Sequence, residues 1–297
     1  MVRAHNKWVL VLGMHRSGTS VITRSLLALG VELGSHLMES VPVVNEKGFW
    51  EDMDIYRLND EMLYFLGTDW YCSTPILNSQ IQLLFDQDYL QRAVDLLRAK
   101  IGNASVFGFK DPRLCRLLSF WQNVLAVLGG PDVYVLALRN PASVADSLKS
   151  RDGIDRTHAY LMWLSHILVA LMLTANRPRV IVEYDNMLRD PFSQLSRIAC
   201  GLDLEIDEYK ARCYVESFLD KRLRHQNRHV IDLRSDPDCP SIVRTLYQYL
   251  RRAAMDKLEL DGESFKRAVG RWNSQLVKLR PVMECIDRFQ TQSFVRR

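Results

Sequence analysis

The chain has 297 residues, of which 47% are hydrophobic and 25% are charged, and these proportions exclude a disordered or low-complexity protein. Its formal net charge of +4 is too small to indicate binding to nucleic acid. The six cysteines are scattered and form no C-x-x-C pair, so we expect reduced thiols in a cytoplasmic protein. The longest apolar run, residues 161–173, is too short to cross a bilayer, and we expect no integral membrane protein.

Apolar segments that predict buried strands alternate with segments of helical periodicity along the first 200 residues. The strands are expected near residues 8–12, 106–109, 133–138 and 179–184. The helices are expected over residues 20–29, 55–66, 81–101 (as one long helix), 117–128, 143–149, 158–176 and 190–200. This alternation predicts an α/β fold with a mostly parallel sheet of four or five strands flanked by helices, of the P-loop type.

The last third of the chain has helical periodicity without predicted strands. Helices are expected over residues 207–219, 242–258 and 263–289. No linker separates this part from the rest, so we expect a single domain over residues 1–297, with residues 205–297 as a helical C-terminal extension. The sequence does not predict the role of this extension.

The segment Gly13-Met-His-Arg-Ser-Gly-Thr-Ser20 follows the first strand and precedes the first helix. Its spacing is that of the phosphate loop G-x-x-x-x-G-K-[ST], except that Thr19 stands in the place of the lysine and Arg16 supplies a cation earlier. A loop of this kind points backbone N–H groups at an anion, so we expect a phosphate site. The alternative is ordinary packing between a strand and a helix.

A second signal follows the strand at 133–138, where Arg139-Asn-Pro141 is followed by Ser147. An arginine at a strand end and a serine eight residues later, in the next helix, can hold one phosphate from two sides. The alternative is a strand–helix junction with an ordinary proline start and a surface serine.

Together the two segments resemble sulfotransferases that use 3′-phosphoadenosine-5′-phosphosulfate (PAPS), and most closely the bacterial group of that superfamily. The resemblance implies that Arg139 and Ser147 bind the 3′-phosphate of PAPS. It also implies that one loop binds the 5′-phosphosulfate, through His15, Arg16, Ser17, Gly18, Thr19 and Ser20. A late basic segment with Arg222 and Arg224 would close over the nucleotide, unless it is only a solvated helix end.

Sulfuryl transfer to a hydroxyl needs a base for the acceptor proton and cations for the transferred group. The loop before residue 52 offers two carboxylates: the phrase N-x-x-G-[FY]-W-E of the bacterial group favours Glu51, whereas the pattern of glycosaminoglycan sulfotransferases favours Glu46. Either residue could instead serve only as a helix cap.

Lys110 resembles the lysine that cytosolic sulfotransferases place beside the transferred group, where it would act together with Arg16. Pro112 stands where those enzymes have a histidine base, which shifts the base role to a carboxylate, with Asp111 in reserve.

The resemblance therefore implies a sulfotransferase with PAPS as co-substrate and no metal, because the leaving group is already a good one. The acceptor would be a carbohydrate, a glycoconjugate or another hydroxyl-bearing molecule, and no nucleic-acid partner is expected. One alternative is a phosphate-loop small-molecule kinase, for which a lysine at position 19 would be typical. The other is a non-catalytic nucleotide-binding scaffold. The sequence leaves the acceptor and the oligomeric state open.

Overall fold

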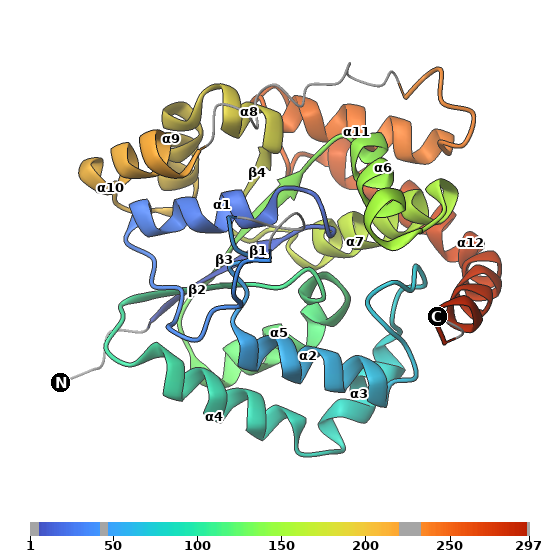
Figure 1. Cartoon of the computed structure of the whole chain (residues 1–297), viewed down its shortest axis with the longest axis horizontal. Helices are drawn as coiled ribbons and strands as arrows, with labels where there is room; N and C mark the ends of the chain where they lie inside the picture. The colour runs from blue at the N-terminus through green and yellow to red at the C-terminus, as the bar shows by residue number, and fades with distance from the viewer. Residues whose placement is uncertain (1–5, 42–46, 220–232, 296–297) are drawn as a thin grey trace.

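The computed structural model describes residues 6–41, 47–219 and 233–295, and its centre is a four-stranded parallel sheet (Figure 1). The strands are β1 (Lys7–Leu12), β2 (Val106–Lys110), β3 (Asp132–Leu138) and β4 (Arg179–Glu183), in the spatial order β2-β1-β3-β4. This arrangement confirms the predicted α/β fold with its parallel sheet. All four carboxyl ends lie along one edge, which is where ligands bind in open parallel sheets.

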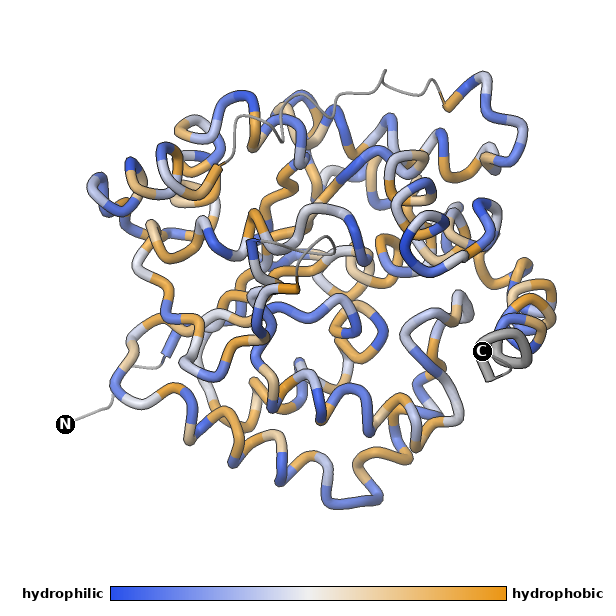
Figure 2. Tube along the Cα trace, in the orientation of Figure 1, coloured by the Kyte–Doolittle hydropathy of each residue, from blue (hydrophilic) through white to orange (hydrophobic). Residues whose placement is uncertain are grey.

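The two faces of the sheet carry side chains of different size, because residues alternate along each strand. Val9 and Val11 of β1 face a layer of small and branched residues, whereas Trp8 and Leu10 face a layer rich in aromatic rings. The strands at the centre of Figure 2 are mostly hydrophobic, and the outer helices alternate between hydrophobic and hydrophilic residues. The sheet is therefore covered on both faces.

Helices on both sides complete the fold. The face with small side chains is covered by α1 (Thr19–Ser25), the 3₁₀ turn η1 (Leu26–Leu29), α8 (Tyr184–Arg189), α9 (Pro191–Leu202), α10 (Glu208–Cys213) and the π-helical turn η2 (Tyr214–Phe218). The aromatic face packs against α2 (Met53–Phe65), α3 (Asn78–Phe85), α4 (Tyr89–Ile101), α5 (Leu114–Leu128), α7 (Arg156–Leu173), α11 (Ser241–Ala253) and α12 (Glu263–Val295). In the sequence, α6 (Pro141–Asp152) lies between β3 and α7. In the part of the chain that the structure describes, no helix combines the length and apolarity needed to cross a membrane.

The prediction of one long helix over residues 81–101 is wrong, because the chain turns between Phe85 and Tyr89 to give α3 and α4. The turn contains Asp86 and Asp88, and aspartate is unfavourable inside a helix but favourable at its ends. Both helices pack against α5.

The C-terminal helix α12 packs against α7 and is also joined to the loop between α2 and α3. Asp287 of α12 accepts hydrogen bonds from the Ser73 N–H (2.8 Å), the Ser73 hydroxyl (2.9 Å) and the Thr74 N–H (2.9 Å). Arg280 donates to the Pro75 carbonyl at 3.0 Å. The C-terminal extension is thus a brace for a loop that lies 200 residues earlier in the sequence.

Candidate active site

The turn from β1 to α1 passes very close to neighbouring strand ends, which explains its two glycines. Gly18 has φ +79°, and a Cβ added there would lie 2.2 Å from Cδ2 of Tyr184. A Cβ at Gly13 would lie 2.9 Å from Cβ of Ala137. Only glycine fits either approach without displacing a neighbour. The sequence spacing of the phosphate loop therefore corresponds to a tight turn packed on β3 and on the residue that follows β4.

Ser17, at the centre of this loop, has features that suit an anion. The residue is fully buried, and its hydroxyl has no hydrogen-bond partner among the described residues. A buried polar group without a partner costs about 1–3 kcal/mol. A phosphate oxygen next to this hydroxyl would remove that cost, so the loop fits the phosphate group that its sequence pattern indicates.

Guanidinium groups converge beside the loop. The Arg16 Nε donates to the Ser147 Oγ at 2.7 Å, and the Arg139 Nη1 donates to the Arg16 carbonyl at 2.9 Å. Burial, together with the nearby Arg151 and Arg139, lowers the pKa of Arg16. Asp152, which binds Arg151 at 2.8 Å, offsets part of this effect. A multiply charged anion beside Arg16 and Arg139 would relieve the remaining repulsion. The two sequence motifs therefore form one cationic site.

Glu51 and Lys110 form a buried ion pair at the carboxyl end of β2. The Lys110 Nζ lies 2.6 Å from the Glu51 Oε1, and the two residues are only 2% and 6% exposed. Burial raises the pKa of Glu51, and the positive charge of Lys110 opposes this rise. The Ser20 hydroxyl donates to the Phe49 carbonyl at 3.0 Å, which ties the segment that carries Glu51 to helix α1. The pair is therefore attached to the phosphate loop.

Asp111, the reserve candidate for the base, is occupied by structural contacts. Its carboxylate accepts from the Asn59 amide at 2.9 Å and from the Arg113 N–H at 2.9 Å and Nη1 at 3.2 Å. These bonds hold the segment before α5, which begins three residues before the predicted Leu117. A carboxylate held in this way is a poor candidate for taking up an acceptor proton.

The structure brings most of the predicted site residues together at the carboxyl edge of the sheet. The loop 15–20, the pair Glu51–Lys110 and the residues Arg139 and Ser147 are linked by the contacts described above. Thr19 is the buried first residue of α1. The predicted residues Glu46, Arg222 and Arg224 lie outside the described residues.

Two residues of the site were missed by the sequence analysis. Tyr184 follows β4 directly, packs under Gly18 and has the Arg139 guanidinium over its ring at 4.6 Å. Arg151 lies in the last turn of α6, where it lowers the pKa of Arg16. Tyr184 could have been found because it stands at a strand end, like Lys110 and Arg139. Arg151 carries no such signal, since it depends on the orientation of α6.

His15 extends from the phosphate loop toward the loop between α2 and α3. Its ring lies 4.8 Å from the Trp70 ring and 6.4 Å from the His166 ring, between centroids. Burial, followed by the charge of Arg113, lowers the pKa of His15 well below its ordinary value. The imidazole is therefore neutral near pH 7 and contributes no positive charge to the phosphate site.

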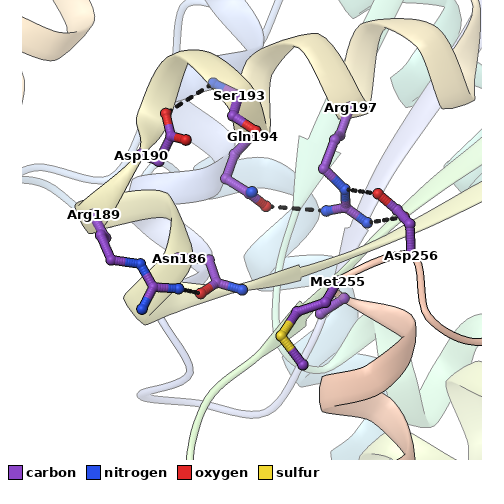
Figure 3. A pocket seen from close by; sticks show the side chains of 9 residues that line it. Asn186, Arg189, Asp190, Ser193, Gln194, Arg197, Met255 and Asp256 are labelled. Atoms are coloured by element: carbon purple, nitrogen blue, oxygen red, sulfur yellow. Dashed lines mark hydrogen bonds and ion pairs between the residues drawn. The ribbon is translucent and has the colours of Figure 1, made fainter.

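A hollow of about 250 Å³ lies between α8, α9 and the segment after α11 (Figure 3). Arg197, on its wall, is held by Asp256 through two bonds of 2.6 Å and by the side-chain amide oxygen Oε1 of Gln194 at 3.0 Å. None of the predicted site residues lines it. Across the residues that the structure describes, no three His, Cys, Asp or Glu side chains are grouped as metal ligands would be.

No protein-family model matches the sequence, and a search of curated proteins gives no match. Among solved structures, the chain is similar to the sulfotransferase domain of the Synechococcus PCC 7002 olefin synthase, with a TM-score of 0.45 and 16% identity over 92% of this chain and 94% of that one. The sulfotransferase domain from the curacin biosynthetic pathway gives a TM-score of 0.45 and 14% identity over 92% and 98%. Retinol dehydratase, in complex with androsterone and the inactive cofactor PAP, gives a TM-score of 0.38 and 13% identity over 91% of this chain and 80% of that one.

Proposed function

We propose that the protein is a sulfotransferase that moves the sulfuryl group of PAPS to a hydroxyl of a carbohydrate or glycoconjugate. In this reaction the bond between sulfur and the 5′-phosphate oxygen breaks and a bond from sulfur to the acceptor oxygen forms. The acceptor proton passes to a base of the protein, and adenosine 3′,5′-bisphosphate (PAP) leaves. The observation that carries the proposal is the hydrogen bond between Arg16 and Ser147, which joins the two motifs into one anion site.

The chain's own residues suit the two ends of the nucleotide. In this proposal Ser17, the backbone of residues 16–20 and the Arg16 guanidinium hold the 5′-phosphosulfate. Arg139 and Ser147 hold the 3′-phosphate. The unsatisfied Ser17 hydroxyl and the cluster of guanidinium groups support this assignment, because both are costly without an anion. PAPS supplies an activated sulfuryl group when it is bound.

Glu51 is proposed as the base and Lys110 as a cation for the transferred group. Burial raises the pKa of Glu51 and so makes its carboxylate more basic, while Lys110 keeps it ionised. As the carboxylate takes up a proton, its hold on the Lys110 ammonium weakens. That ammonium is then free to stabilise, with Arg16, the charge that develops on the transferred group.

The experiment that tests this function offers the purified protein PAPS and ATP together, with and without Mg²⁺, in the presence of a glycan mixture. Nucleotides are separated by chromatography and sulfate esters by mass spectrometry. We expect PAPS to be converted to PAP, with an equal amount of sulfate ester and no loss of ATP. Turnover of ATP with no conversion of PAPS would favour the kinase alternative over the sulfotransferase. Binding of a nucleotide without any turnover would favour the non-catalytic scaffold.

A further inference from the structure

Four side chains lie near the Glu51–Lys110 pair, and we call them the Tyr56–Trp70 strip: Tyr56, Arg113, His15 and Trp70. The Arg113 guanidinium lies over the Tyr56 ring at 4.5 Å, and the His15 ring lies 4.8 Å from that of Trp70. Arg113 joins the two halves, since its charge acts on both His15 and Glu51. Tyr56, His15 and Trp70 are partly exposed, whereas Arg113 is buried.

Two carboxylates lie beside the strip. The Asp60 Oδ1 is 3.4 Å from the Arg113 Nε, and the Asp69 Oδ1 accepts from the Trp70 N–H at 2.6 Å. Burial raises the pKa of Asp69, and the neighbouring Asp60 raises it further, as expected for two acidic groups that feel each other. Carboxylates accept hydrogen bonds from hydroxyls and repel other anions.

The strip contains one imidazole, that of His15, and the buried His166 ring lies 6.4 Å from it between centroids. The His166 Nδ1 bonds to the Met162 carbonyl at 2.7 Å, so Nδ1 carries the proton and Nε2 is an acceptor. The Nε2 atoms of His166 and His15 are both buried and have no hydrogen-bond partner in the described parts of the chain. Burial lowers the pKa of both rings, and His166 reaches about 3, so neither adds a positive charge.

Two guanidinium groups do lie on the strip, since Arg113 lies over the Tyr56 ring and Arg151 lies over the Trp70 ring at 5.7 Å. Each is paired with a carboxylate, Arg113 with Asp111 at 3.2 Å and Arg151 with Asp152 at 2.8 Å.

The loop that carries Trp70 is fixed at both ends. The Arg116 Nη2 donates to the Thr68 Oγ1 at 2.7 Å and its Nη1 to the Cys72 carbonyl, and Asp287 of α12 holds the next two residues. Trp70 is therefore held at one end of the strip before any ligand binds. Such preorganisation favours binding, because little side-chain or loop freedom is lost.

We propose that the Tyr56–Trp70 strip is the acceptor subsite and that it takes an uncharged, polyhydroxylated ring, that is, a neutral sugar. The exposed parts of two aromatic rings offer apolar surface to the C–H groups of such a ring. Asp60 and Asp69 offer acceptors for its hydroxyls. The same two carboxylates disfavour uronic acids and sugars that already carry sulfate or phosphate. This inference rests on the proposed sulfotransferase function.

The test uses an immobilised array of neutral and acidic glycans, with PAPS labelled in its sulfuryl group, and PAP affinity is measured by calorimetry in parallel. We expect label on neutral glycans and little on acidic ones. Tyr56→Ala is expected to reduce labelling at least tenfold and to leave PAP affinity within twofold of the wild type. Trp70→Ala is expected to reduce labelling at least as much, and its labelling is compared at saturating PAPS because the Arg151 guanidinium lies over the Trp70 ring at 5.7 Å. Trp70→Phe is expected to keep part of the activity. Tyr64→Ala is the matched control, because Tyr64 lies on the same helix as Tyr56 and is 85% exposed.

Asp69→Asn tests the charge itself, since asparagine retains an oxygen for the Trp70 N–H. We expect this variant to raise labelling of acidic glycans about three- to tenfold relative to neutral ones. Label mainly on acidic glycans, or on none while PAP still binds, would overturn the neutral-sugar subsite. Full activity of Trp70→Ala would do the same. Loss of PAP binding by the wild-type protein would instead overturn the proposed function.

Discussion

The Arg16 Nε donates a hydrogen bond of 2.7 Å to the Ser147 Oγ, although the two residues are 131 positions apart in the sequence. This bond joins the phosphate loop to helix α6, and the Arg139 bond to the Arg16 carbonyl joins both to the end of β3. The cationic site is therefore held together by hydrogen bonds between its own residues. Such bonds reduce the free-energy cost of ordering these side chains on binding.

The contribution of Arg139 can be measured by its removal. A charge-assisted hydrogen bond to a phosphate contributes roughly 1.5–3 kcal/mol. We expect Arg139→Ala to weaken PAP binding about ten- to a hundredfold and to change the affinity for adenosine 5′-phosphosulfate little, as measured by calorimetry. Arg57→Ala, at an exposed position on α2, is the control. Equal losses for both nucleotides would place Arg139 away from the 3′-phosphate.

Gly18 and Gly30 separate the effect of backbone conformation from that of close packing. Both have positive φ, but a Cβ at Gly18 would collide with Tyr184, whereas one at Gly30 would meet nothing within 4 Å. We expect Gly30→Ala to lower the free energy of unfolding by about 1 kcal/mol and to leave PAP binding unchanged. We expect Gly18→Ala to lower the free energy of unfolding by more than Gly30→Ala does and to weaken PAP binding at least tenfold. Similar behaviour of the two variants would mean that the loop tolerates displacement of Tyr184.

Glu51→Gln tests the proposed base. General bases commonly contribute about 10²–10⁴ in rate, so we expect kcat to fall by that factor while PAP affinity is kept. Because only the ionised carboxylate accepts a proton, the wild-type rate should rise with pH through a pKa above the ordinary value for glutamate. The variant should lose this dependence. Glu46→Gln is the comparison, and an inactive Glu46→Gln beside an active Glu51→Gln would exchange their roles.

Since Glu51→Gln also leaves the Lys110 ammonium without its ion-pair partner, the variant should be less stable than the wild type. Circular dichroism and thermal unfolding are therefore recorded for each variant, and rates are compared well below the lower melting temperature.

Asp287 gives a prediction for the brace formed by α12. Hydrogen bonds to its carboxylate, which outweigh burial, lower the pKa of Asp287 to about 2 from an ordinary 3.8. A carboxyl group whose pKa is lowered by folding stabilises the folded protein at pH values above its ordinary pKa. This stabilisation is lost as the pH falls through the pKa of the folded protein, here between about pH 4 and 2. This contribution is roughly 2 kcal/mol. In urea unfolding, Asp287→Asn should be less stable than the wild type by this amount at pH 7 and by a smaller amount near pH 3. A difference that does not depend on pH would show that the charge of Asp287 is unimportant.

The sequence was most informative where one strand leads into one turn. The four strands and the phosphate loop have local signals, since apolar runs and the spacing of Gly13 and Gly18 depend on neighbouring residues only. The break at Asp86–Asp88 was missed because the helical periodicity continues across it. Contacts such as Glu51 with Lys110, or Asp287 with Ser73, join segments that are distant in sequence. No spacing rule predicts such contacts, so the residues of the proposed acceptor subsite could not be grouped from the sequence.

The most direct test of the account is a calorimetric titration of the wild-type protein with PAP and with ATP, each with and without Mg²⁺. Thr19 stands where a kinase loop has lysine, and the guanidinium groups of Arg16 and Arg139 converge with Arg151 beside Ser147. We expect PAP to bind at least a hundredfold more tightly than ATP, with no need for Mg²⁺. Tighter binding of Mg²⁺–ATP than of PAP would contradict the sulfotransferase assignment.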